Sequence, residues 1–187
     1  MNKPLLAVVT GRPASGKTTL AHILSKEIKC PLLSRDELKE GYINTLDIEH
    51  DRLDNSVAWH IYNSFFEAMD LLISKNISVI VEAAFQNKLW KPKLLNLSDK
   101  AEIKIIICNT SPDIAKTRFA SRLLNDPDRN RFHGDKFMNS VKEQDRLMTE
   151  HYEPVNIDAP TLEVDTTENY NPGLGEIISF IKKNSGC

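Results

Sequence analysis

The sequence predicts an α/β fold, a three-layer sandwich in which helices cover both faces of a five-stranded parallel sheet. Two features of the 187-residue chain lead to this class. Short unbroken runs of apolar residues are typical of strands buried on both faces, and they alternate with segments whose apolar residues have helical spacing. This order of strand, helix and strand favours parallel strands that are joined by helices.

The first part of the chain supplies three strands. Strands are expected at 5–9, 31–33 and 77–81, and helices at 19–28, from Ser34 onward, and at 56–75. Ser34 and Glu37 have the spacing of a capping box, which marks the start of the second helix. The helix at 56–75 carries a stripe of apolar side chains that would pack on the sheet.

The second part follows the same order. A helix around 89–95 precedes a strand at 103–108, and a cap at Ser111 with Pro112 then begins a helix that ends near Leu124. Residues 125–134 are polar and turn-rich, and an amphipathic helix is expected over 137–148. A strand at 160–165 and a helix at 174–181 complete the expected elements.

The composition favours a single domain over 1–187. Apolar residues make up 41% of the chain, enough for one core, and no linker divides it. A net charge of −2 argues against a dedicated nucleic-acid or membrane surface. The three cysteines form no C-x-x-C pair, the five histidines have no zinc-binding spacing, and neither a signal peptide nor a membrane span is evident. A cytoplasmic location is therefore expected.

Residues 11–19 match the phosphate-binding pattern G-x-x-x-x-G-K-[ST] between a buried strand and a helix. The backbone N–H groups of such a loop, together with the helix dipole, hold a triphosphate. The lysine can reach the terminal phosphates, and the hydroxyl of the next residue can bind Mg²⁺. The nucleotide contacts expected in this loop are Gly11, Arg12, Pro13, Ala14, Ser15, Gly16, Lys17, Thr18 and Thr19.

Two carboxylates follow predicted strands. Asp36 could accept the proton of a substrate hydroxyl and could also contact the metal, or it could simply stabilise the positive end of its own helix. Glu82 ends the third strand, where phosphate-loop proteins place an acidic residue that orients the metal. The alternative for Glu82 is an ion pair at a strand end.

A group of arginines follows the fourth predicted strand. Its members are Arg118, Arg122, Arg129 and Arg131. We expect a lid over about 118–136 that brings these side chains onto the phosphates, with Arg122 as a catalytic residue, because such a lid stabilises charge and excludes water. The alternative is a solvated helix face that pairs with Asp113 or Asp126.

Five segments should meet in one crevice, because ligands of parallel sheets lie at the carboxyl ends of the strands. The positions at those ends are Gly11, Asp36, Glu82, Thr110 and Thr166. A helical region at about 36–75 should form the wall for the phosphate acceptor. Trp59 and His60 are the least core-like residues of its aromatic stripe.

The chain resembles the P-loop kinases grouped with polynucleotide kinase, chloramphenicol phosphotransferase and zeta-toxin-like kinases in four segments, GRPASGKTT, LLSRDELKEG, ISVIVEAAF and PDIAKTRFASR. The resemblance implies the P-loop nucleoside-triphosphate hydrolase fold of the kinase type, Asp36 as the base, and an adenine near Thr166 and Thr167. Two positions depart from the pattern. Glu82 stands where the family generally has Asp, and Lys39 is nearest to the place where polynucleotide kinase has Arg.

The sequence therefore predicts an ATP-dependent phosphotransferase that uses Mg²⁺ and moves the γ-phosphate to a hydroxyl of a small molecule or nucleoside-like acceptor. An ATP-binding module without transfer and a polynucleotide 5′-hydroxyl kinase are the alternatives, and nucleic acid is the less favoured partner. A GTPase switch is disfavoured because the chain has no N-K-x-D or D-x-x-G segment. The pattern of residues leaves the acceptor and the oligomeric state open.

Overall fold

The computed structural model describes residues 3–47, 54–125, 129–133 and 152–183. Its centre is a parallel sheet of five strands in the order β2-β3-β1-β4-β5, which confirms the predicted class. The strands are β1 (Leu5–Gly11), β2 (Leu32–Ser34), β3 (Val79–Glu82), β4 (Glu102–Asn109) and β5 (Thr161–Asp165). The middle strand, β1, therefore leads directly into the phosphate loop.

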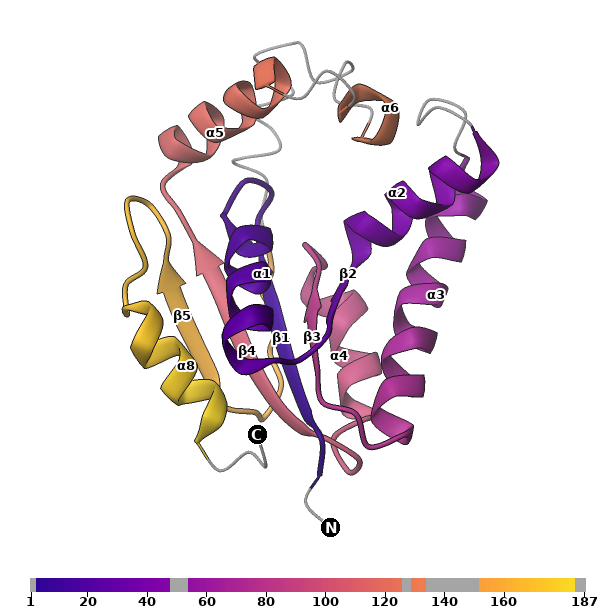
Figure 1. The fold of residues 1–187 in the computed structure, drawn as a ribbon, viewed down its shortest axis with the longest axis vertical. Coiled ribbons are helices and arrows are strands. Elements are labelled where there is room, and N and C mark those ends of the chain that lie inside the picture. Colours follow the sequence, from indigo (N-terminus) through magenta and orange to yellow (C-terminus); the bar gives the residue numbers. More distant parts are fainter. Residues whose placement is uncertain (1–2, 48–53, 126–128, 134–151, 184–187) are drawn as a thin grey trace.

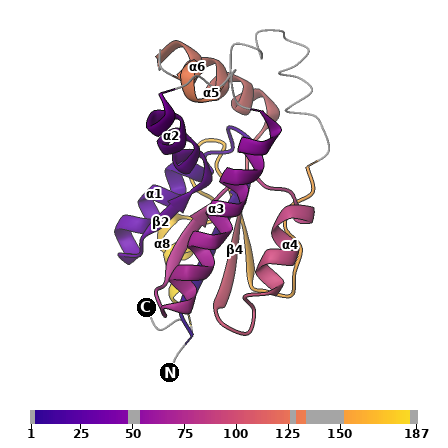
Figure 2. The same ribbon diagram turned by 90° about the vertical axis from the view of Figure 1, so that its right-hand side faces the viewer.

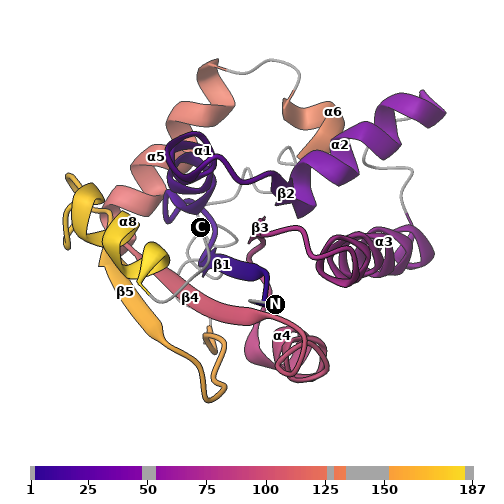
Figure 3. The ribbon, with the colours of Figure 1, turned by 60° about the horizontal axis from the view of Figure 1, so that its bottom comes forward.

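Helices lie on both faces of the sheet, as the predicted sandwich requires (Figures 1 and 3). One face is covered by α1 (Lys17–Ile28) and α8 (Leu174–Lys182), and the other by α3 (Asn55–Ser74) and α4 (Asn87–Leu95). Beyond the carboxyl ends of the strands lie α2 (Arg35–Leu46), α5 (Pro112–Asn125) and α6 (Arg129–His133), as Figures 1 and 2 show. Helix α6 contacts both α5 and α2, so these three helices surround the end of the sheet where ligands are expected.

Alternation along β1 builds one core on each face of the sheet. Leu6 and Val8 pack with side chains of α3 and α4, whereas Leu5, Ala7 and Val9 pack with side chains of α1 and α8. All five residues are buried. An unbroken apolar run is thus what a strand between two helical layers needs.

Helix α2 begins at the predicted position but without the predicted capping box. Ser34 precedes the helix, yet its hydroxyl makes no capping hydrogen bond. It donates instead to Oε2 of Glu82, over 2.8 Å. Glu37 pairs with His22 on α1, at 2.6 Å. The capping-box interpretation is therefore wrong, because the Ser34 hydroxyl satisfies a buried carboxylate on the neighbouring strand.

The segments after β4 agree only in part with expectation. The predicted cap of α5 is confirmed, since the Ile114 N–H donates to Oγ of Ser111 over 3.3 Å. The polar segment at 125–134 contains a short helix, α6, where only turns were predicted. The helix predicted over 137–148 lies outside the described residues.

Lys104 is a lysine buried within β4, with only 3% of its surface exposed. Its ammonium group donates to the carbonyl oxygens of Phe180, Ile181 and Lys183 at the end of α8, and lies 3.2 Å from the carboxylate of Glu102. The last carbonyls of a helix have no partner inside it, and a cation there also meets the negative end of the helix dipole. Lys104 therefore fastens the end of α8 to the sheet.

Replacement of Lys104 by methionine should destabilise the fold. The variant Lys104→Met leaves these carbonyl groups without their donor, so the free energy of unfolding should fall by about 2–4 kcal/mol. Lys100→Met is the matched control, because this exposed lysine lies 3.5 Å from Asp70, and the change should cost less than about 0.5 kcal/mol. Urea denaturation followed by circular dichroism measures both variants. Equal losses would contradict the role given to Lys104.

Candidate active site

The phosphate loop requires glycine at two positions. Gly11 has a φ of 151°, and a Cβ atom there would lie 2.3 Å from the carbonyl oxygen of Cys108 on β4. Gly16 has a φ of 77°, in the left-handed region that glycine adopts without strain. The loop therefore combines a close approach to the neighbouring strand with a left-handed turn at the start of α1.

A buried lysine and a buried glutamate lie at the base of the loop. Lys17 is 6% exposed and Glu82 is 1% exposed, and Nζ of Lys17 lies 3.7 Å from Oε1 of Glu82. Lys17 also donates to the Arg12 carbonyl oxygen over 3.4 Å. The register of the sheet explains this cluster, because Glu82 on β3 pairs with Val9 of β1 on one side and with Ser34 of β2 on the other.

The environment of Glu82 favours the protonated form. Burial raises the pKa of this carboxyl above its ordinary value, while the Lys17 charge and the Ser34 hydrogen bond lower it by less. The nearby Asp36 charge raises the pKa further, and the Thr18 side chain lowers it. A cation placed beside Glu82 would favour its ionised form.

The residues present fit a nucleotide bound with Mg²⁺. Oε1 of Glu82 and Oγ of Ser15 are buried and have no hydrogen-bond partner among the described residues. A buried polar atom without a partner is costly, so such atoms point to a ligand that satisfies them. Mg²⁺ prefers oxygen ligands, which Thr18 and Glu82 can offer. The described part of the chain has no cluster of three or more His, Cys, Asp or Glu that could hold a metal, so phosphate oxygens or water would complete the coordination.

Asp36 occupies the first turn of α2, with 48% of its side chain exposed. Arg35 donates to its Oδ1 over 2.9 Å. Burial raises the pKa of Asp36, but the charge and hydrogen bond of Arg35, with the charges of Lys17 and Lys39, lower it more, and the net pKa lies below its ordinary value. Asp36 is therefore ionised at neutral pH and able to accept a proton.

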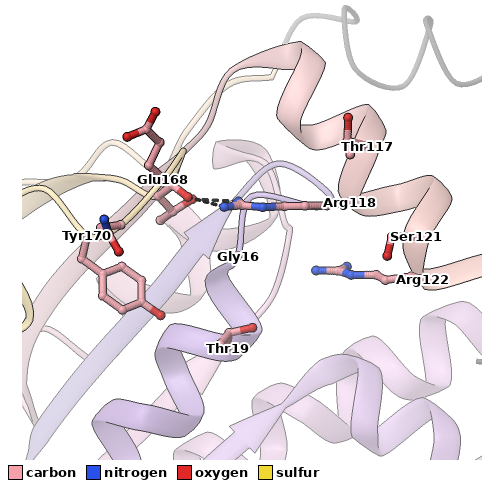
Figure 4. A pocket seen from close by; sticks show the side chains of 10 residues that line it. Gly16, Thr19, Thr117, Arg118, Ser121, Arg122, Glu168 and Tyr170 are labelled. Carbon is pink, nitrogen blue, oxygen red and sulfur yellow. Dashed lines mark hydrogen bonds between the residues drawn. The ribbon is translucent and has the colours of Figure 1, made fainter. Parts of the chain in front are cut away.

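Two cavities open beside the phosphate loop. The Asp36 cavity, of about 420 Å³, lies between the loop, α2 and α5 and includes Lys17, Thr18, Asp36, Glu40, Arg122 and His133 in its lining. The Thr166 cavity, of about 610 Å³, includes Gly16, Thr19, Arg118, Arg122, Thr166 and Tyr170 and is seen from close by in Figure 4. Thr19 and Arg122 line both cavities, so the two cavities adjoin between α1 and α5.

Arg118 and Arg122 lie one turn apart on α5 but have different surroundings. Arg118 donates to the carbonyl oxygens of Thr166 and Thr167 and, over 3.3 Å, to Oγ1 of Thr166 (Figure 4). Arg122 reaches toward the space between α5 and the start of α1. Arg118 therefore holds the loop after β5, whereas contact of either arginine with phosphate stays a prediction.

The other two predicted lid arginines belong to α6. Arg131 on α6 forms an ion pair with Asp47, at 2.9 Å, beyond the end of α2. The Arg129 side chain lies outside the described part of the chain. A further α6 residue, His133, contacts Glu40 on α2 at 2.9 Å. Helix α6 thus contacts α2 and the residue that follows it through two pairs of side chains.

Thr166 ties the strand ends together. Its Oγ1 donates to the Ser15 carbonyl oxygen over 2.6 Å, and its N–H donates to the Asn109 carbonyl oxygen over 2.8 Å. The residue is 4% exposed. Thr166 lines the Thr166 cavity, where a nucleotide contact was predicted. Its hydroxyl hydrogen, however, is already donated to the phosphate loop at Ser15. Thr110 lies close by, with its Oγ1 3.5 Å from that of Thr167.

Two residues at this edge, Arg35 and Tyr152, carried no predicted role, and Trp59, which the sequence singled out, lies elsewhere. Arg35 has its signal in the segment Ser-Arg-Asp, where a cation precedes the proposed base. Tyr152 has none, yet its hydroxyl lies 3.0 Å from Oγ1 of Thr10 behind the loop, and Arg12 lies over its ring at 5.8 Å. Trp59, at 58% exposure, contacts the edge of the Tyr62 ring and is not part of the described lining of the Asp36 cavity.

A family model described as an AAA domain matches residues 6–147, which is more than half of the chain. The chain therefore belongs to this AAA domain family. Its phosphate loop and sheet order are those of the P-loop kinase fold, which confirms the predicted resemblance. A comparison with curated proteins finds no match.

Solved structures share this fold over nearly the whole chain. A protein from Chloroflexus aurantiacus, provisionally described as a kinase, is 25% identical with a TM-score of 0.81, over 98% of this chain and 96% of that one. APS kinase from Mycobacterium tuberculosis, solved with AMPPNP and APS, is 13% identical with a TM-score of 0.66, over 98% and 100% of the two chains. A sugar kinase from a Janibacter species is 19% identical with a TM-score of 0.63, over 95% and 94%. The latter two similarities concern the fold alone.

Among the described helices, none combines the length and the apolar character that crossing a bilayer would require.

The raised pKa of Glu82 leads to a testable prediction. The variant Ser34→Ala removes a hydrogen bond that favours the ionised form, so the pKa of Glu82 should rise further. Carbon-13 NMR of the side-chain carboxyl measures it. Ser98→Ala, which removes an exposed hydroxyl bonded to Leu95, is the control and should leave the pKa unchanged.

The raised pKa of Glu82 also determines how the stability of the fold changes with pH. Because the folded state holds the Glu82 proton more tightly than the unfolded chain, its contribution to the free energy of unfolding falls as pH rises from about 4.5 through the raised folded-state pKa. A folded-state pKa at or below the ordinary value would contradict the account of Glu82.

Proposed function

We propose that this protein is an ATP-dependent phosphotransferase that moves the γ-phosphate to a hydroxyl of a small acceptor. The observation that carries the proposal is that Lys17, Thr18 and Asp36 line a single cavity. A phosphate-binding lysine and a metal-binding hydroxyl thus face the same space as an ionised carboxylate that can serve as a base. Membership in the family and the similarity to solved kinases support the same conclusion.

The proposed reaction uses the loop to hold the phosphates and Asp36 to activate the acceptor. The acceptor oxygen attacks the γ-phosphorus while its proton passes to the Asp36 carboxylate, and the bond from the γ-phosphorus to the bridging oxygen of ADP breaks. Lys17 and Arg122 offer positive charge to the phosphate oxygens. Mg²⁺, held by Thr18 and Glu82, would neutralise charge on the phosphates when bound.

The contacts of Asp36 suit a base rather than a structural carboxylate alone. Arg35 bonds one oxygen and keeps the group ionised, while about half of the side chain remains exposed. Helix α2 also gains from a negative charge in its first turn, so the two roles are compatible. The resemblance to polynucleotide 5′-hydroxyl kinases implies the same role for Asp36.

The alternatives are less well supported. In an ATP-binding module without transfer, Asp36 would serve only the start of α2 or the metal, and the acidic side of the cavity would have no role. A polynucleotide kinase needs a basic path for the strand, whereas Glu37 and Glu40 lie in the Asp36 cavity. Lys39, nearest to the place of the expected arginine, is 7% exposed and is not part of the described lining.

The role of Asp36 as the base is tested by replacing it with asparagine. In the presence of an acceptor, Asp36→Asn should lower kcat about 100-fold or more while the KM for ATP changes little, because the base acts only in the transfer step. Transfer of the γ-phosphate is measured with labelled ATP and a panel of acceptors that contains hydroxyl compounds and 5′-hydroxyl oligonucleotides.

Asp99→Asn provides the matched control, because this exposed aspartate lies far along the chain from the site residues, and its kcat should equal that of the wild type. A wild-type protein that binds ATP but transfers phosphate to no member of the panel would count against the kinase proposal. An unchanged kcat in Asp36→Asn would remove Asp36 as the base.

The two arginines of α5 should have separable effects. Arg122→Ala should lower kcat about 100-fold, because a charge beside the transferred phosphate stabilises the transition state. Arg118→Ala should mainly raise the KM for ATP, because Arg118 orders Thr166 and, through it, the carbonyl of Ser15.

Steady-state kinetics with varied ATP measures both effects. Lys116→Ala, on the same helix, is the control for loss of a cation, and it should leave both constants near the wild-type values. Equal effects of Arg118→Ala and Arg122→Ala on kcat would contradict the division of roles.

A further inference from the structure

The acceptor side of the Asp36 cavity is acidic. Asp36, Glu37 and Glu40 all line it, and all three lie on α2. Asp36 and Glu40 are four residues apart, so they share one face of the helix. The same lining includes Phe119 on α5 and Ala84 after β3, which add no charge. An acceptor that approaches Asp36 therefore meets carboxylates along α2.

The basic side chains in and beside this cavity already have partners or lie on the donor side. Lys17 lies beside Glu82 at the base of the phosphate loop, and Arg122 borders both cavities where the donor phosphates would lie. His133, whose side chain is 13% exposed, pairs with Glu40, and His22 pairs with Glu37. Lys17 and Arg122, the basic side chains of this lining, thus lie on the donor side, and the two histidines contact the acidic residues of α2.

Glu40 has the best position to contact the acceptor. It lies one turn beyond Asp36, and its side chain is 38% exposed. His133 bonds Oε1, at 2.9 Å, and so fixes the carboxylate from the α6 side. A carboxylate can accept hydrogen bonds on both oxygens, so Glu40 keeps capacity for further donors while it holds His133.

We infer that the acceptor carries no negative charge near its reacting hydroxyl, and that its hydroxyl or ammonium groups donate hydrogen bonds to Glu40, which makes Glu40 a specificity-determining residue. An anion placed here would meet like charges, which costs binding free energy and rejects wrong partners. The cavity of about 420 Å³ suits a small polyol or amino alcohol. The inference rests on the proposed function of the Asp36 cavity.

The test uses triplets of compounds that share a carbon skeleton, for example glucose, glucosamine and gluconate, with labelled ATP. The neutral or amino member of the accepted triplet should have a kcat/KM at least about 10-fold above that of the acidic member. Glu40→Gln should lower the kcat/KM of the preferred compound about 10-fold, since the charged carboxylate that receives its hydrogen bonds is lost. The KM for ATP should stay within about twofold of the wild-type value.

Glu27→Gln is the matched control, because this exposed glutamate lies on α1 away from the lining, and its kcat/KM should stay at the wild-type value. Amino and neutral members separate the two acceptor chemistries, since only the ammonium compound should bind more weakly at high ionic strength. Equal or better transfer to acidic members, or equal effects of Glu40→Gln and Glu27→Gln, overturns the inference.

Calorimetry separates this inference from the proposed function. The same triplets are titrated into the protein loaded with a non-hydrolysable ATP analogue. Binding of non-anionic members that is weakened in Glu40→Gln supports the role of Glu40 even if no phosphate is transferred, and such a result would contradict only the kinase proposal. Transfer with a preference for anions contradicts only the inference, and binding of no member contradicts both.

Discussion

The buried pair of Lys17 and Glu82 is the constraint on which the rest of the site depends. Burying two charges is costly unless each is well satisfied, and here Oε1 of Glu82 has no hydrogen-bond partner among the described residues. A fold selected only for stability would favour apolar side chains at these strand ends. The sheet instead brings β1, β2 and β3 together so that the loop lysine, Ser34 and Glu82 share one small volume. Such an arrangement is explained by a charged ligand that completes it.

The same edge of the sheet also ties the loop to its other neighbours. Gly11 approaches β4 so closely that a side chain would collide with the Cys108 carbonyl, and Thr166 bonds the Ser15 carbonyl from the loop after β5. Arg118 in turn holds Thr166 from α5. Hydrogen bonds therefore connect α5, through Thr166, to the phosphate loop, so a shift of α5 would be transmitted to the loop.

Local patterns in the sequence predicted the parts of this structure that local physics decides. The apolar runs gave the strands, because residues such as Leu5 to Val9 are buried on both faces, and the glycines and lysine of the loop gave its place between β1 and α1. Contacts between distant segments were not predictable. The sequence around Ser34 predicts that its hydroxyl caps a helix. In the fold, the hydroxyl donates instead to the buried carboxylate of Glu82 on the neighbouring strand. The hydrogen-bond partners of Arg118, in the loop after β5, are likewise distant from it in the sequence.

This difference bears on how the two substrates are recognised. In the proposed function the donor is bound by a contiguous segment, residues 11–19, so the sequence of that segment alone predicts donor binding. The proposed acceptor cavity is lined by side chains of α2, α5 and α6, which come together only when the fold is complete, as the pairing of Glu40 with His133 illustrates. A chain can therefore change its acceptor through a few side chains on these helices while the loop stays intact. Similarity in the loop and sheet then identifies the fold and the donor chemistry, whereas the charge along α2 carries the information about the acceptor.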